Sequence, residues 1–221
     1  NFLNKNEEFV SVRGCIGSFH LDSKNKLIKN ISVFKEEESL VFNDPIDRLK
    51  KGFSSNHSYL PTYYDVHKTE NLKKNYQILH NMNTEEFLMI EVLTNLLDTI
   101  DGKIGRLNDI YLLRQLNDNE SSNAEYFYKT GDILDRIINN KYIDDFNKMK
   151  KILFDEVIKS GYKDKERASK VINTYSKILL YNFIKSIDKS KKIKRNNANL
   201  IKKIFNKFKF YLNILLKKKY W

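Results

Sequence analysis

The segment from Asn83 to Leu116, NTEEFLMIEVLTNLLDTIDGKIGRLNDIYLLRQL, has the most regular apolar pattern in the chain. Its apolar residues recur in alternating steps of three and four, at Ile90, Leu93, Leu97, Ile100, Ile104, Leu107 and Tyr111. This heptad spacing is typical of a helix that packs along its length against other helices. Asn83 and Glu86 have the spacing of a capping box at its start. The segment therefore predicts one continuous helix of roughly 50 Å, at about 1.5 Å per residue.

A helix of this length needs partner helices of similar length. Helical periodicity is present in the segments Thr69–Met82, Asn123–Ser160, Asp164–Ile187 and Asn197–Lys219. Gly161 is suited to end the second of these, because glycine adopts positive φ at little cost. With 7 Gly and 2 Pro, the chain has too few turn residues for a barrel or sandwich of many short strands. We therefore predict an all-α fold, an elongated bundle of about four long, mostly antiparallel helices over residues 62–221.

The first 61 residues have no long helical period, and we expect them to form an N-terminal arm of short or irregular pieces packed on the bundle. The pieces FVSVR, from Phe9, and HLDSKNKLIKNISVF, from His20, look extended or irregular. Asp44 before Pro45 predicts a short helix, because aspartate caps helices and proline fits their first turn. That helix should end at Gly52. Whether the whole arm is ordered stays open.

Positive charge is concentrated at the C-terminal end of the chain. The net charge is +12, from 40 basic and 28 acidic residues. Twelve of the basic residues lie between Lys189 and Trp221, where there is no acidic residue, so residues 1–188 hold 28 of each sign. This uneven distribution of charge indicates what the protein binds and says little about how it folds.

The predicted helix from Asn197 to Lys219 has a broad apolar face, and lysines cover the rest of its surface. A basic amphipathic helix followed by a terminal Trp is typical of a segment that lies on an anionic membrane. The residues that we expect to contact the membrane are Lys202, Lys203, Phe205, Lys207, Phe208, Lys209, Tyr211, Leu212, Leu215, Lys217, Lys218, Lys219 and Trp221. The alternative is that the apolar face closes the core of the bundle.

Catalytic signatures are missing from the sequence. The four histidines, His20, His57, His67 and His80, form neither an HExxH motif nor a pair one helical turn apart. Cys15 is the only cysteine, which excludes an intramolecular disulfide, and it has no histidine beside it. The DTIDG fragment at Asp98–Gly102 lacks the spacing of a calcium loop. Gly14 and Gly17 lack the strand and helix that frame a phosphate-binding loop. We predict a protein that is not an enzyme and that holds no cofactor or metal.

The chain resembles a family of small, non-perforin malaria-parasite proteins that sporozoites need for cell traversal. The resemblance covers its size, its Lys- and Asn-rich composition, the heptad pattern Ile90–Tyr111 and the tail KKIFNKFKFYLNILLKKKYW from Lys202 to Trp221. It implies a secreted protein, stored in sporozoite secretory organelles (micronemes), that acts without catalysis at host cell membranes. Three Asn-x-Ser sequons, at Asn30, Asn56 and Asn119, are compatible with a secretory route.

Two functions are therefore expected, and a lipid requirement separates them. In the first, the region Lys189–Trp221 contacts or wounds a host membrane, and opening of the bundle assists it. In the second, the protein is a soluble helical adhesin or scaffold whose basic end meets an acidic surface on a host or parasite protein. Nucleic-acid binding ranks lower, because the basic connection before Asn197 has no helix-turn-helix, aromatic sheet or zinc-ligand frame. The oligomeric state is not predicted.

Overall fold

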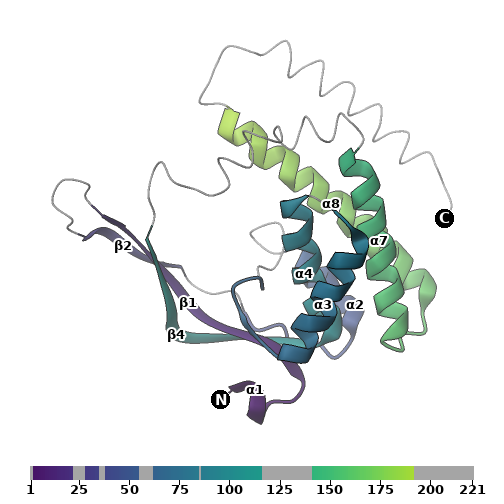
Figure 1. Cartoon of the computed structure of the whole chain (residues 1–221), viewed down its shortest axis with the longest axis horizontal. Coiled ribbons are helices and arrows are strands. Elements are labelled where there is room, and N and C mark those ends of the chain that lie inside the picture. The colour runs from purple at the N-terminus through teal and green to yellow at the C-terminus, as the bar shows by residue number, and fades with distance from the viewer. Residues whose placement is uncertain are drawn as a thin grey trace. The chain divides into compact units, whose positions relative to one another are not determined.

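The computed structural model of the 221-residue chain describes residues 2–21, 28–34, 38–54, 62–84, 86–115 and 141–191. These residues form a mixed α/β fold, with four strands and six helices among them (Figure 1). The prediction of an all-α bundle is therefore wrong. By its contacts the chain divides into two compact units, Asn1–Leu180 and Tyr181–Trp221, and the sheet belongs to the first.

The elements follow one another in an order that mixes strands and helices. They are α1 (Phe2–Lys5), β1 (Phe9–Leu21), β2 (Ile28–Phe34), α2 (Pro45–Phe53), β3 (Val66–His67), α3 (Thr69–Met82), α4 (Phe87–Asp101), β4 (Lys103–Gln115), α7 (Lys141–Lys159) and α8 (Lys165–Lys191). The described residues of the two pieces that look extended in the sequence thus lie in β1 and β2.

Strand β1 pairs with each of the other three strands of the sheet. It pairs antiparallel with β2, with Ile16 opposite Phe34, and antiparallel with the short β3, with Ser11 opposite His67. It pairs parallel with β4 from Phe9 to Phe19. A parallel pair needs a long crossover, and the chain between β1 and β4 provides one that contains α2, α3 and α4.

Helix α4 is the centre of the packed core. It contacts α2, α3, α7, β1 and β4. Leu93, Leu96 and Leu97 on α4 are completely buried, as are Ile104 at the start of β4 and Leu153 on α7. A helix that is apolar around most of its surface is expected at the inside of a fold rather than at one side of a bundle.

The predicted rod from Asn83 to Leu116 is divided between α4 and β4. Asn83 is the left-handed residue that ends α3, with φ of 52°, and α4 begins only at Phe87. Gly102 has an extended backbone, with φ of −178°, and a Cβ there would come within 2.9 Å of the Glu8 carbonyl oxygen. The chain therefore leaves the helix at a glycine that passes close to β1. The β-favouring residues that follow, such as Ile104 and Ile110, then continue as a strand.

Several local predictions are confirmed. Helix α3 has the predicted bounds, Thr69–Met82. Helix α2 begins at Pro45, and the Asp44 carboxylate accepts a hydrogen bond from the backbone N–H of Ile46 at 2.7 Å. Gly161, between α7 and α8, has φ of +90°. Residues 123–140 of one predicted helix and the whole helix predicted from Asn197 to Lys219 lie outside the described residues.

Candidate functional site

A network of buried polar side chains lies where β3 and the preceding turn meet α3 and α4. Its members are Thr62, His67, Asn75, Asn95 and Asp98, and none of these side chains is more than 5% exposed. They come from four separate segments of the chain, so no local motif marks them. In the sequence, Asp98 stands out only as part of the DTIDG fragment, and nothing there indicates this network.

Thr62 and Asp98 form the centre of the network. The Thr62 hydroxyl lies 2.5 Å from Asp98 Oδ2 and 2.8 Å from Asn95 Oδ1, which also accepts the Thr62 backbone N–H at 2.8 Å. Asn75 donates to Asp98 Oδ1 at 2.9 Å. His67 Nε2 lies 2.9 Å from the Thr62 carbonyl oxygen, and its Nδ1 lies 3.5 Å from Asp98 Oδ2. Because a carbonyl can only accept, Nε2 carries a proton.

Asp98 is buried and accepts hydrogen bonds from Thr62 and Asn75. The Thr62 hydroxyl has one proton and two close acceptors, Asp98 Oδ2 and Asn95 Oδ1, which share it. Burial raises the pKa of Asp98 to about 6, although the adjacent His67 and the hydrogen bond from Thr62 oppose this shift. The network therefore holds a carboxyl group that takes up a proton more easily than an exposed aspartate does.

A second buried cluster surrounds Asp65 beside β1 and β4. The Ser11 hydroxyl donates to Asp65 Oδ2 at 2.9 Å, and Arg106 donates to the same oxygen at 2.8 Å. Arg13 Nε lies 3.7 Å from Asp65 Oδ1. Burial raises the pKa of Asp65, and the charges of Arg106 and Arg13 act in the opposite direction. The cluster joins the turn before β3 to two strands of the sheet.

Both clusters are enclosed, which fits a structural role better than a catalytic one. Their side chains hold separate segments of the chain together. No group of three or more His, Cys, Asp or Glu side chains in the described ranges is arranged to hold a metal ion. We therefore interpret the His67 and Asp98 side chains as parts of a structural network.

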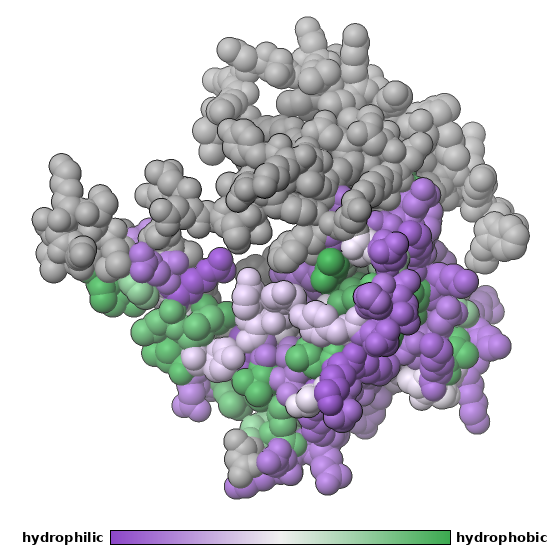
Figure 2. Space-filling view, in the orientation of Figure 1, coloured by the Kyte–Doolittle hydropathy of each residue, from purple (hydrophilic) through white to green (hydrophobic). Residues whose placement is uncertain are grey.

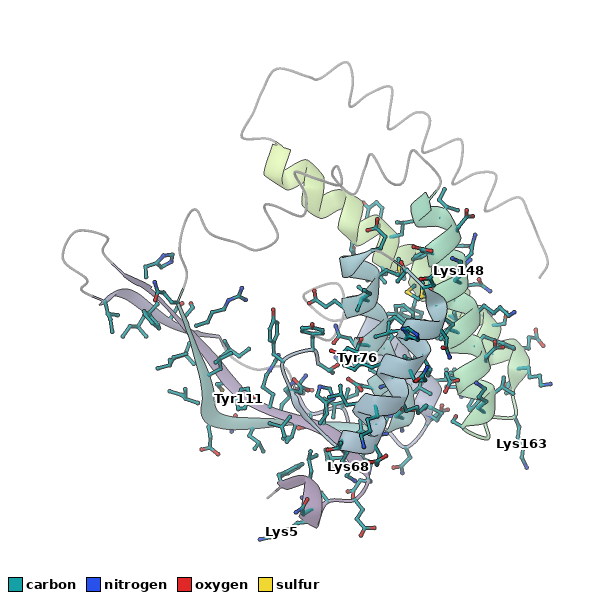
Figure 3. All side chains as sticks on the ribbon, in the orientation of Figure 1. Lys5, Lys68, Tyr76, Tyr111, Lys148 and Lys163 are labelled. Atoms are coloured by element: carbon teal, nitrogen blue, oxygen red, sulfur yellow. The ribbon has the colours of Figure 1, made fainter. Side chains whose placement is uncertain are left out.

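The candidate functional site is an exposed part of the sheet. Two strands contribute large apolar side chains that are between 37% and 66% exposed, namely Ile28, Ile31 and Val33 on β2 and Ile110, Tyr111, Leu112 and Leu113 on β4. Figure 2 shows apolar surface over the strands, and Figure 3 labels Tyr111 on β4. Successive residues of a strand point to opposite faces, so apolar side chains are exposed on both faces of β4.

Two glycines of β1 allow β4 to lie against it. A Cβ at Gly14 would lie 2.2 Å from the Asp109 carbonyl oxygen, and one at Gly17 would lie 2.5 Å from Leu113 Cδ2. The β1–β4 register shifts on both sides of Cys15, between these glycines. Gly14 and Gly17 therefore serve strand pairing, since glycine inside a strand permits close approach of another backbone.

Among the described residues, the outer edge of β4, opposite β1, is paired at its beginning. Leu40 exchanges two backbone hydrogen bonds with Ile104 in an antiparallel bridge, at 2.8 and 3.0 Å. The Ser39 hydroxyl accepts the Arg106 backbone N–H at 2.8 Å. No strand in the described part of the chain pairs with this edge from Asn108 to Arg114, and all seven residues are exposed. We call this stretch, Asn108–Arg114, the outer β4 edge.

The residues expected to contact a membrane, from Lys202 to Trp221, all lie outside the described residues, so the structure does not place them. Among the helices that the structure describes, none is both long and apolar enough to cross a bilayer. The outer β4 edge had a sequence signal, four consecutive large apolar residues between Asp109 and Arg114. The heptad pattern assigned these residues to a helix, and the signal was missed.

No protein-family model matches the chain, no curated protein matches it, and no solved structure matches it.

Proposed function

We propose that this protein is a non-enzymatic binding protein that adds an extended segment of a protein partner to the outer β4 edge. The observation that carries the proposal is the exposed stretch Asn108–Arg114, whose outer edge has no paired strand among the described residues. Addition of a strand to a free sheet edge is a recurrent mode of peptide recognition, because backbone hydrogen bonds supply affinity and side-chain contacts supply specificity.

The composition of β4 supports a binding role for its edge. Natural proteins protect free edges with lysine, proline, bulges or short strands, because an open apolar edge promotes aggregation. The sequence of β2 has polar residues, one of them a lysine, between its apolar residues. On the outer β4 edge, Asp109 and Arg114 flank the run Ile110–Leu113 and the β1–β4 register shifts beside it, but the run itself contains no lysine or proline. An edge of this kind is expected where a partner covers it.

Backbone chemistry favours a protein partner over lipid at this edge. An unpaired strand exposes backbone N–H and C=O groups that need hydrogen-bond partners, and hydrocarbon provides none. A strand from another protein satisfies these groups and also covers the apolar side chains. The exposed edge supports binding to a protein, which is the second function expected from the sequence, although that expectation assigned the contact to the basic end of a helical bundle.

Membrane contact through Lys189–Trp221 stays a prediction from charge and sequence pattern. The parasite setting came from a resemblance that depended on the heptad pattern Ile90–Tyr111, and the structure divides that pattern between a helix and a strand. The four-helix bundle is therefore wrong, and the structure gives no support to cell traversal or secretion.

The test of the proposal is fluorescence anisotropy with the full chain and a labelled ten-residue peptide of alternating Val and Thr. Two N-methylated forms of the peptide carry methyl groups on alternate residues, one form for each edge of the peptide strand. We expect one form to bind like the parent and the other to lose binding, because only one set of N–H groups faces β4. Equal binding by both forms, or no binding by the parent, contradicts the proposal.

A matched pair of variants locates the binding site. Ile110 on β4 and Ile31 on β2 are 62% and 66% exposed, so substitution of either should leave the fold intact. Ile110→Lys should weaken peptide binding, because lysine on an edge disfavours strand addition. Ile31→Lys should leave binding unchanged. Loss of binding in Ile31→Lys alone would place the site on β2 and contradict the assignment to β4.

A further inference from the structure

We infer that the segment bound at the outer β4 edge carries an acidic residue, four apolar or β-branched residues and a basic residue, in that order from its N-terminus. The inference rests on the proposed function and names the chemistry of the partner. It follows from two exposed charges on β4 and from the antiparallel direction of the single bridge, Leu40–Ile104, on this edge.

The first observation is the pair of charges that flanks the apolar run. Asp109 precedes Ile110–Leu113 and Arg114 follows it, and both charged residues are exposed. The structure shows no ion pair between either of them and another described residue. Opposite charges that face each other across two strands stabilise the pair, and like charges destabilise it. A partner strand should therefore place a basic residue opposite Asp109 and an acidic residue opposite Arg114.

The second observation gives the direction of the bound strand. Leu40 pairs with Ile104 on the same outer edge, and this bridge is antiparallel. Antiparallel pairing is also slightly more stable per residue than parallel pairing. A strand that extends the pairing in this direction begins opposite Arg114 and ends opposite Asp109. Its acidic residue therefore comes first and its basic residue last.

A second copy of β4 does not satisfy these charges. Two antiparallel strands related by a two-fold axis place one residue opposite its own copy, because hydrogen-bonded and non-hydrogen-bonded pairs alternate. In the two central registers of this kind, Asp109 faces Leu113 or Gln115 of the other copy and does not face Arg114. The charge pattern therefore favours a segment of a different protein.

The test uses two labelled peptides with the same centre of four β-branched residues, one with Glu before it and Lys after it, the other with these ends exchanged. The full-length protein should bind the Glu-first peptide about tenfold more tightly, given two favourable pairs in place of two unfavourable ones. The preference should shrink as salt is added, since exposed charges are screened. A variant with Asp109→Lys and Arg114→Glu should prefer the Lys-first peptide. Circular dichroism of the variant serves as the control for its fold.

The outcomes separate this inference from the proposed function. If neither peptide binds, the proposed function fails and the inference fails with it. If both peptides bind equally and the charge-reversed variant shows no preference, strand addition stands and the charge pattern is wrong. If the original protein prefers the Lys-first peptide, the direction is wrong. If sedimentation velocity shows a dimer that Ile110→Lys disrupts, the edge is occupied by a second copy and the inference is overturned.

Discussion

At the scale of single residues, the raised pKa of Asp98 has a consequence for stability. Burial raises the pKa of Asp98 from 3.8 to about 6, so the folded protein binds a proton at this group more tightly than the unfolded chain does. The stabilisation from this group is fully present below pH about 4 and is lost as the pH rises through about 6. A shift of this size corresponds to a loss on the order of 3 kcal/mol in the free energy of unfolding.

Asp98→Asn isolates this effect, because an amide resembles the neutral acid in its hydrogen bonds. The variant should lose less free energy of unfolding between pH 4.5 and 7.5 than the original protein, as measured by urea denaturation at several pH values. Asp65 also has a raised pKa and contributes to the slope in both proteins, so the difference between them is the informative quantity. Asp155→Asn on the exposed face of α7 is the control. An unchanged slope in Asp98→Asn would show that Asp98 is charged throughout.

Substitution by alanine should have unequal effects at Gly14 and Gly17. In Gly14→Ala the new methyl group would lie 2.2 Å from a backbone oxygen of Asp109, which cannot move without shifting β4. In Gly17→Ala it would meet the end of the Leu113 side chain, which is 56% exposed and free to rotate. Gly14→Ala should therefore cost about 1–3 kcal/mol, as overpacking usually does, and Gly17→Ala clearly less. Equal thermal stability of the two variants would argue against the observed β1–β4 register.

At the scale of secondary-structure elements, Arg48 joins α2 to the end of α4. Its guanidinium group donates to the carbonyl oxygens of Thr99 and Ile100 at 2.8 Å each, and to those of Phe42 and Asn43 at 2.7 and 2.8 Å. The bonds to Thr99 and Ile100 satisfy carbonyl groups at the C-terminus of α4, which otherwise lack partners within the helix. One buried side chain thus fixes the positions of two helices and of the segment before α2.

Arg48→Met should destabilise the protein by roughly 2–4 kcal/mol, because it leaves several buried carbonyl oxygens without donors. Arg167→Met is a suitable comparison, since Arg167 also contacts α2, through Asp44 and Asp47, but on the exposed surface. Surface ion pairs contribute little, so this variant should stay close to the original protein. Urea denaturation of both variants provides the measurement. A larger loss in Arg167→Met than in Arg48→Met would contradict the burial of Arg48.

The elements that the sequence predicted are those with local signals. Helix α2 has its Asp44 cap and Pro45, and α3 has a helical period that ends at Asn83, so their bounds could be read without knowledge of the fold. Strand β4 could not be predicted from local signals, because the heptad spacing that begins in α4 continues past Gly102 by coincidence. The parallel pairing of β4 with β1 joins residues far apart in the sequence, and nothing local specifies it.

The candidate site was hidden for the same reason. The run Ile110–Leu113 is compatible with a helix or a strand, and only its pairing with β1 decides between them. The buried network around Asp98 could not be predicted either, because Thr62, His67 and Asn75 come together only in the folded chain. The charge distribution could be read from the sequence, because it does not depend on the fold.

At the scale of the whole molecule, the chain combines a neutral part with a basic end. Residues 1–188 have balanced charges, whereas Lys189–Trp221 carries twelve basic residues and no acidic one. Basic segments near an anionic membrane surface gain roughly 1 kcal/mol per residue. This distribution predicts an association that does not depend on the outer β4 edge.

Co-sedimentation with anionic and neutral liposomes tests this prediction. The full chain should bind anionic vesicles at low salt, and a chain that ends at Asp188 should not. Circular dichroism of the shorter chain shows whether it is folded, and Ile110→Lys in the full chain should leave vesicle binding unchanged. If the full chain ignores anionic vesicles at low salt, the basic end has another partner.

Amide hydrogen exchange tests most directly whether the outer β4 edge is free to bind a partner strand. In the free protein, alternate backbone amides between Asn108 and Arg114 face away from β1 and should exchange rapidly, while the amides of β1 exchange slowly. After addition of the Glu-first peptide, the same alternate amides should become protected and those of β2 should not change. If every amide of this stretch is already protected in the free protein, or if the peptide protects none of them, the edge is not a binding site.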